Sequence, residues 1–201
     1  MKRIALGITG ASGAILAREL TRALLAAGCE VHLTASRAGR IVIAEELGPP
    51  VGGAHGVIPG LTHERLREWG EKDFSAPFAS GSARFAGMAI VPCSMSTVGA
   101  IASGISDNLL RRGAEVMLKE RRPLVIAPRE APLSTIHLRN LLTAAEAGAI
   151  VIPPVLTFYQ KPGDSVLDQV RFVLARVLDH LGVANELAPR WGETAAGNPP
   201  S

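Results

Sequence analysis

Residues 9–14, Thr-Gly-Ala-Ser-Gly-Ala, form a glycine-rich turn between an apolar run and an amphipathic run. Gly10 and Gly13 let the backbone approach a ligand closely, and the start of the following helix offers free N–H groups to a phosphate. The glycines at positions 7, 10 and 13 do not have the G-x-G-x-x-G spacing of dinucleotide-binding folds. The turn therefore predicts a phosphate-bearing ligand, with an ordinary tight turn as the alternative.

A second candidate site lies in residues 124–134, Leu-Val-Ile-Ala-Pro-Arg-Glu-Ala-Pro-Leu-Ser. Four apolar residues lead into Pro128, a pattern typical of a strand that is buried on both faces. Arg129 and Glu130 follow side by side, before Pro132. The sequence thus predicts one positive and one negative side chain at the end of a buried strand.

Residues 93–97, Cys-Ser-Met-Ser-Thr, follow another apolar run and offer hydroxyl groups and backbone amides at the start of a helix. They suit a second polar or anionic part of the same ligand. Ordinary N-capping by Ser94 or Ser96 explains them equally well.

Arg112, Glu115 and Lys119 share one face of a predicted helix, because three and seven residues separate them. Local clustering of basic residues favours a small anion such as a phosphate. The alternative is a solvated helix face with a Glu115–Lys119 ion pair.

Strand-like and helix-like runs alternate along the chain and must position these residues. Strands are predicted at 3–9, 30–35, 87–92, 124–128 and 149–154. Helices are predicted at 14–28, 37–47, around 96–103, 107–122, 134–148 with Ser134 as N-cap, and 165–182. This order predicts an α/β fold, a Rossmann-like parallel sheet with helices on both faces, whose ligand lies at the carboxyl ends of the strands.

The remaining segments are predicted to be loops and a tail. Residues 48–60 and 71–83 are rich in Gly, Pro and Ser and are expected to be loops whose apolar residues are exposed. We expect a single domain over 1–183, and a tail over 184–201, containing Trp191, that docks on the body or on a neighbouring subunit.

Composition excludes several classes of protein. A chain of 201 residues with 47% hydrophobic and 19% charged residues is globular rather than disordered. No apolar run reaches the roughly 20 residues of a membrane span, and we expect a cytoplasmic protein. A net charge of +3 with 4% aromatic residues argues against nucleic acid. Cys29, Cys93 and the scattered histidines show no metal-ligand spacing, so no metal site is expected.

An NAD(P) reductase of the short-chain type also carries a similar glycine turn, but the sequence excludes it. Ser36 stands where the ribose-binding acid is expected, at the end of the second strand. The Tyr-x-x-x-Lys pair is also missing, because Gly163 follows four residues after Tyr159.

Taken together, the motifs resemble the flavin prenyltransferases of the UbiX type. The resemblance covers residues 2 to about 193 and is carried by GITGASGA, PCSMST, DNLLRRGAEVMLKERRPLVIAPREAPLSTIHLRNLL, GAIVIPP, FYQKP, LARVLDHLG and PRWGE. It implies a flavodoxin-like sheet and reduced FMN as the cofactor. It also implies transfer of a dimethylallyl group from dimethylallyl phosphate to N5 and C6 of the flavin. The expected product, prenylated FMN, serves UbiD-type decarboxylases, and the expected assembly is a dodecamer.

The resemblance assigns roles to named residues. It implies that FMN is held by Gly10, Ala11, Ser12, Ser36, Ser94, Met95, Ser96, Thr97 and Arg129. It implies that the phosphate of the prenyl donor is held by Arg112, Lys119, Tyr159 and Arg176, although Arg176 alone also fits a side chain that snorkels from a half-buried helix. Glu130 would shuttle a proton beside the leaving phosphate, and Ser12 would lie near flavin N5, linked to Glu46 of another subunit.

The physical chemistry agrees with this reaction, because a departing phosphate needs fixed positive charge. No Asp-rich motif for Mg²⁺ occurs, which favours a metal-independent reaction of a monophosphate, with pyrophosphate as the open alternative. Phe74 stands where some relatives have Trp, so the sequence does not determine the size of the prenyl pocket. Alternative functions are an FMN-dependent decarboxylase of cysteine-derived substrates, whose Pro-x-Met-Asn motif is replaced here by APREAPLS, and a non-catalytic FMN carrier.

Overall fold

The computed structural model describes residues 1–49, 56–158 and 165–190, which form a parallel sheet covered by helices. The six strands follow the order β3-β2-β1-β4-β5-β6. Their bounds are β1 Arg3–Ile8, β2 Glu30–Ala35, β3 Leu66–Trp69, β4 Gly87–Cys93, β5 Leu124–Pro128 and β6 Ile150–Val151. The helices are α1 Ala14–Ala26, α2 Arg37–Leu47, α3 Met95–Ala102, α4 Leu109–Lys119, α5 Thr135–Glu146 and α6 Val166–His180. The predicted fold class is confirmed.

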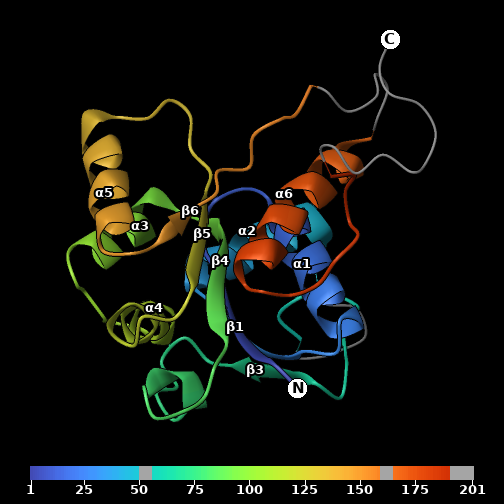
Figure 1. The fold of residues 1–201 in the computed structure, drawn as a ribbon, viewed down its shortest axis with the longest axis horizontal. Coiled ribbons are helices and arrows are strands. Elements are labelled where there is room, and N and C mark those ends of the chain that lie inside the picture. The colour runs from blue at the N-terminus through green and yellow to red at the C-terminus, as the bar shows by residue number, and fades with distance from the viewer. Residues whose placement is uncertain (50–55, 159–164, 191–201) are drawn as a thin grey trace.

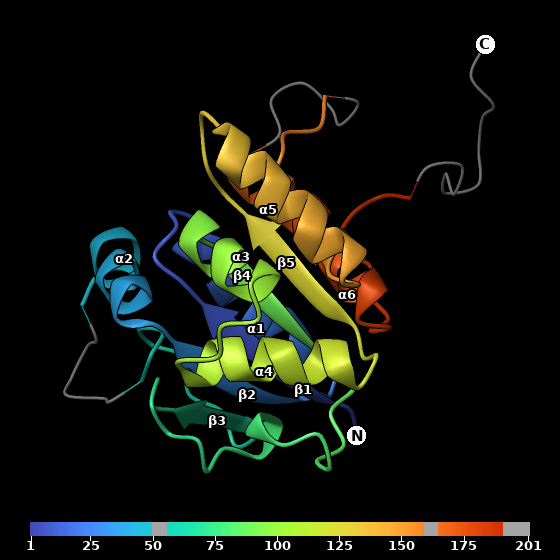
Figure 2. The same cartoon turned by 90° about the vertical axis from the view of Figure 1, so that its left-hand side faces the viewer.

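The helices cover both faces of the sheet (Figures 1 and 2). Helices α1, α2 and α6 lie on one face, and α3, α4 and α5 lie on the other. Every residue of β4 and β5 is buried, because helices cover both sides of these central strands. The chain builds the sheet outward from β1 through β2 to β3 and then returns to add β4 on the other side of β1. The boundary between β1 and β4 is therefore the topological switch point where such sheets bind ligands.

Two sequence predictions about strands were wrong. The edge strand β3 was missed, because Leu66–Trp69 is short and carries the charged Arg67 and Glu68. The strand predicted at 149–154 shortens to β6, because Pro153 and Pro154 have no N–H to donate to a neighbouring strand.

Loop 71–83 is held more firmly than its composition suggests. Phe78 lies in the short 3-10 turn Pro77–Ala79 and is fully buried, contrary to the expectation of exposed apolar loop residues. Arg122 donates hydrogen bonds to the carbonyl oxygens of Gly81 (2.7 Å) and Ala83 (2.6 Å). Phe74 is half exposed, as the sequence predicted for the apolar residues of this loop.

Ser134 caps α5, as the sequence predicted. Its hydroxyl accepts a hydrogen bond from the N–H of His137, and the His137 ring accepts one from the N–H of Ser134. This reciprocal cap fixes the start of α5 directly after the Arg129–Glu130 segment.

His32 on β2 is a buried titratable side chain with two hydrogen bonds. Its Nδ1 accepts from the indole N–H of Trp69 (3.1 Å), so the ring is neutral and its Nε2–H donates to Glu30 (2.8 Å). Burial lowers the pKa of His32 below its usual value and outweighs the opposing effect of Glu30.

We predict a stability that falls in acid because of His32. Its contribution is present above pH 6.5, the ordinary pKa in the unfolded chain, and is lost as pH falls through the lower folded pKa. Urea unfolding at pH 7.5 and pH 5 should show a smaller acid loss for His32→Gln than for the parent chain. Equal losses in both proteins would contradict the prediction.

Candidate functional site

A cavity of ≈ 280 Å³ lies where the first turn of the sheet meets the starts of three helices. Five of its lining residues are predicted FMN-binding residues: Gly10, Ser36, Ser94, Ser96 and Thr97. The structure therefore brings together three segments that are far apart in the sequence.

The β1–α1 turn depends on its glycines. An ideal Cβ on Gly10 would lie 2.5 Å from the Cβ of Ala38, so α2 packs directly on the turn. Gly13 is the N-cap of α1 at φ 121°, a conformation that favours glycine. Since glycine has no side chain, this helix start needs a capping group from elsewhere.

Glu46 of the same chain supplies that capping group. Its carboxylate accepts the N–H of Gly13 (3.0 Å) and the N–H of Ala14 (2.7 Å). Partial burial pushes the pKa of Glu46 up. Hydrogen bonds from the Ser12 side chain and from the two backbone N–H groups, together with the charge of Arg129, outweigh this, so the pKa is lowered. The predicted link between Ser12 and Glu46 exists, but the expectation that Glu46 comes from another subunit was wrong.

The start of α3 presents hydroxyl groups and unsatisfied amides. The Ser94 hydroxyl bonds to the hydroxyls of Ser96 (3.1 Å) and Thr97 (3.0 Å) and makes no side-chain cap to the helix backbone. The simple capping explanation for Ser94 therefore fails. The amide of Thr97 donates to the carbonyl oxygen of Ser94 (2.9 Å), which leaves the amides of Met95 and Ser96 to meet a ligand. Met95 is buried in the core, so only its backbone can contribute.

Two further helix starts face the same cavity. Ser36 caps α2 by accepting the N–H of Gly39 (3.0 Å), and Asn108 caps α4 by accepting the N–H of Arg111 (2.9 Å). An ideal Cβ on Gly39 would lie 2.6 Å from the carbonyl oxygen of Ile8, which shows how closely α2 approaches β1. Together with α3, these helix starts direct partial positive charge towards the cavity.

Sequence reasoning missed several lining residues, among them Glu71, Asn108 and Arg111. Glu71 accepts the N–H of Arg37 (2.9 Å) and the amide of Asn108 (3.2 Å), and so joins the starts of α2 and α4. The Nε of Arg111 is buried without a hydrogen-bond partner. Asn108 directly precedes a helical pattern, so it was recognisable as an N-cap. Glu71 lies in a loop, and nothing in the sequence around it indicates that it lines the cavity.

These features fit a phosphate-bearing cofactor. Hydroxyl groups and three helix starts suit a phosphate group, and Gly10 has no side chain between the backbone and the cavity.

Arg129 and Glu130 lie exposed at the end of β5, next to the β1–α1 turn. The Nε of Arg129 donates to the carbonyl oxygen of Ser12 (3.3 Å), and its backbone N–H donates to that of Cys93 (3.2 Å). The carboxylate of Glu130 accepts the N–H of Ala131 (3.1 Å). Within the described residues these side chains contact the backbone and not each other, so Glu130 is not merely the counter-ion of Arg129.

The predicted phosphate-binding residues of α4 are engaged in local contacts. Arg112 pairs with Glu115 (2.9 Å) and donates to the carbonyl oxygen of Ala79 (3.0 Å). Lys119 pairs with Glu120 (2.6 Å), so the Glu115–Lys119 ion pair of the alternative interpretation does not form. Hydrogen bonding from the hydroxyl of Ser106 and then from Arg112 lowers the pKa of Glu115 despite some burial.

Arg176 does not join Arg112 and Lys119 within one chain. It lies on α6, on the opposite face of the sheet from α4 (Figures 1 and 2), and it is exposed between buried neighbours. Tyr159, the fourth predicted substrate-binding residue, lies outside the described residues.

Two features, a membrane span and a metal site, are absent from the described residues. No helix in this part of the chain has both the length and the apolarity to cross a membrane. No group of three His, Cys, Asp or Glu side chains there is arranged to hold a metal ion.

Comparison with known proteins places these features in a family. The family model described as Flavoprotein matches residues 1–180. The flavin prenyltransferase UbiX of Pseudomonas aeruginosa is 42% identical over 199 residues, which cover 96% of this chain and 95% of the relative.

Solved structures give the same result. The crystal structure of AnUbiX in complex with FMN and dimethylallyl pyrophosphate superposes with a TM-score of 0.86 at 39% identity, covering 96% of this chain and 99% of that one. A dodecameric FMN-dependent UbiX-like decarboxylase from Escherichia coli superposes with a TM-score of 0.82 at 39% identity, covering 94% and 98%.

Proposed function

Because the chain belongs to the flavoprotein family and is a flavin prenyltransferase of the UbiX type, we propose that it transfers a dimethylallyl group from dimethylallyl phosphate to N5 and C6 of reduced FMN. The observation that carries the proposal is the cavity lined by Gly10, Ser36, Ser94, Ser96 and Thr97, with Arg129 and Glu130 beside its β1–α1 turn. The cavity supplies the cofactor site, and the neighbouring pair supplies charge and a proton-transfer group.

The FMN phosphate is held by the starts of α2, α3 and α4 and by the hydroxyls of Ser36, Ser94, Ser96 and Thr97. Arg129 and the backbone of Gly10, Ala11 and Ser12 hold the remainder of the cofactor, and the backbone of Met95 contributes at the start of α3. When bound and reduced, the flavin supplies the nucleophilic atoms that form the new bonds to the prenyl carbons.

The residues around the donor stabilise its leaving group. The allylic C–O bond breaks, and the phosphate leaves with the bonding electron pair, so positive side chains lower the barrier. Arg112, Lys119, Tyr159 and Arg176 provide those contacts, and Glu130 transfers a proton at the leaving phosphate. Glu46 keeps Ser12 in place near flavin N5 through its contacts with the turn.

The site is completed by more than one copy of the chain. Arg112 and Lys119 lie across the sheet from Arg176, so a single chain cannot place all three cations on one phosphate. Exposed apolar side chains on α5 and on the segment after β6 offer contact area: Ile136, Leu138, Leu142, Val155, Leu156 and Phe158.

A homo-oligomer, with the dodecamer named for the relative from Escherichia coli as the expected size, follows from this arrangement. Light scattering should give a mass many times the 21.0 kDa of one chain. A mass near that of a single chain would contradict the shared site.

The proposed reaction is tested by anaerobic incubation with dithionite-reduced FMN and dimethylallyl phosphate. Mass spectrometry of the extracted flavin should show a five-carbon adduct, and phosphate should be released in equal amount, with or without EDTA. Dimethylallyl pyrophosphate in a parallel reaction decides between the two donors. Bound flavin without adduct or phosphate release would favour the carrier, and carbon dioxide release from cysteine-derived substrates would favour the decarboxylase.

The prenylated FMN then passes to a UbiD-type decarboxylase in the cytoplasm. An apo-decarboxylase of that type should gain activity when it is mixed with the reaction product.

A further inference from the structure

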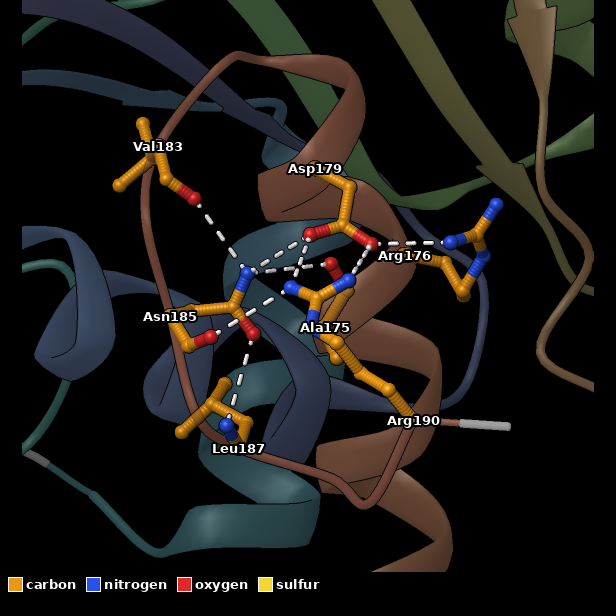
Figure 3. A network of polar contacts seen from close by, with 7 residues as sticks. All are labelled: Ala175, Arg176, Asp179, Val183, Asn185, Leu187 and Arg190. Carbon is orange, nitrogen blue, oxygen red and sulfur yellow. Dashed lines mark hydrogen bonds and ion pairs between the residues drawn. The ribbon is translucent and has the colours of Figure 1, made fainter. Parts of the chain in front are cut away.

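A network of polar contacts joins the end of α6 to the chain that follows it (Figure 3). The carboxylate of Asp179 lies at its centre. Arg190 binds both carboxylate oxygens, Oδ1 at 2.8 Å and Oδ2 at 3.2 Å, whereas Arg176 binds only Oδ2, at 2.9 Å. The two arginines therefore compete for one counter-ion, and Arg190 makes the two-pronged contact that arginine forms best.

The segment after α6 is shaped to bring Arg190 to this place. The amide of Asn185 donates to Asp179 Oδ1 (3.0 Å), and its Oδ1 accepts the N–H of Leu187 (3.4 Å). Arg190 also donates to the backbone carbonyl oxygen of Asn185 (3.4 Å). The segment thus folds back along α6 and holds a second guanidinium against the residue that pairs with Arg176.

Two guanidinium groups compete for the carboxylate of Asp179. Hydrogen bonding from Arg190 is the main reason that the pKa of Asp179 is lowered, so the carboxylate stays ionised at neutral pH. The Arg176 side chain is 51% exposed and that of Arg190 is 41% exposed, whereas that of Asp179 is 22% exposed, so a ligand can reach the guanidinium of Arg176. Among the described residues, the Arg176 side chain donates a hydrogen bond to Asp179.

We propose that Asp179 and Arg190 are positioning residues for Arg176. Asp179 orients the Arg176 guanidinium. Arg190 shares the carboxylate of Asp179, which weakens the pairing of that carboxylate with Arg176, so that Arg176 keeps its affinity for the substrate phosphate. The inference rests on the proposed role of Arg176 in binding that phosphate. Without Arg190, the Asp179 carboxylate pairs with Arg176 alone and competes with the phosphate for the Arg176 guanidinium.

The same helix contains a matched control. Arg171 pairs with Asp168 (3.2 Å) at the same spacing of three residues and with a similar exposure of 49%. Arg171→Gln therefore removes an equivalent ion pair of α6 without touching the Asp179 cluster.

The experiment measures KM and kcat for dimethylallyl phosphate with the full-length, FMN-loaded protein. The dissociation constant of inorganic phosphate is determined by calorimetry on the same samples, together with the melting temperature. Arg190→Gln should raise KM and the phosphate dissociation constant by about twofold to fivefold, the size expected for an exposed charge pair, and leave kcat within about twofold. Arg171→Gln should change KM by less than about twofold.

The decisive variant is the double substitution Arg190→Gln with Asp179→Asn. It removes the competing charge but keeps a side-chain oxygen that can accept a hydrogen bond from Arg176, so KM and phosphate affinity should return towards the parent values. If Arg190 only fastens the segment, the double variant should not recover, which would overturn the inference. Arg176→Gln separates the two ideas. An unchanged KM there refutes the proposed role of Arg176 itself, whereas a raised KM without the recovery refutes only the charge competition.

Discussion

Glu130→Gln is expected to lower turnover by about 10²–10⁴-fold, the usual contribution of a general acid or base, while FMN remains bound. The carboxylate is exposed at the end of β5, and its described contact is the N–H of Ala131 at 3.1 Å. Glutamine can keep that hydrogen bond but cannot transfer a proton. Folding should therefore be nearly unaffected, and the loss should appear in single-turnover formation of the prenyl adduct.

The control for Glu130 is Glu64→Gln, which neutralises another exposed glutamate far from the site in the sequence. Flavin absorption, melting temperature and the single-turnover rate should be measured on one preparation of each protein. If Glu130→Gln melts at a lower temperature but keeps the parental rate, Glu130 serves only the fold.

Arg129→Ala is expected to weaken FMN binding by about ten- to a hundredfold, since hydrogen bonds to charged groups contribute about 1.5–3 kcal/mol. Arg129 joins the end of β5 to the β1–α1 turn through the Ser12 carbonyl oxygen, and its charge lies close enough to Glu46 to lower the pKa of that carboxyl. Alanine removes both effects and leaves the cavity walls in place.

Quenching of FMN fluorescence during titration measures the affinity of this variant. Arg139→Ala, which removes an exposed arginine of α5, should bind FMN like the parent chain. An unchanged FMN affinity in Arg129→Ala would show that the guanidinium serves the donor phosphate alone.

The sequence predicted the parallel sheet and the Gly10, Ser36 and Ser94–Thr97 cluster because strand ends in such folds converge by topology. It missed contacts that depend on packing between distant segments. Glu46 reaches the turn only because α2 packs on Gly10, and a helix pattern alone cannot show which turn a glutamate caps. Glu71 lies in a loop without periodicity, so no local pattern places it at the cavity.

The separation of Arg112 from Arg176 was also hidden, since the sequence does not state which face of the sheet each helix covers. Each arginine lies in a segment that the sequence predicts to be a helix, and the resemblance assigns both to one phosphate. The structure places their helices on opposite faces. Composition and periodicity describe one chain, whereas a shared site depends on how copies meet.

The convergence of three helix starts on one cavity has a consequence for protein engineering. Recognition by main-chain amides is available to every residue type, so single side-chain replacements there should leave much of the anion binding intact. Libraries that aim to accept a different flavin should therefore vary the lengths of the loops leading into α2, α3 and α4 rather than their side chains. Gly39, where α2 contacts β1, tolerates the least change, because an added Cβ would lie only 2.6 Å from the carbonyl oxygen of Ile8.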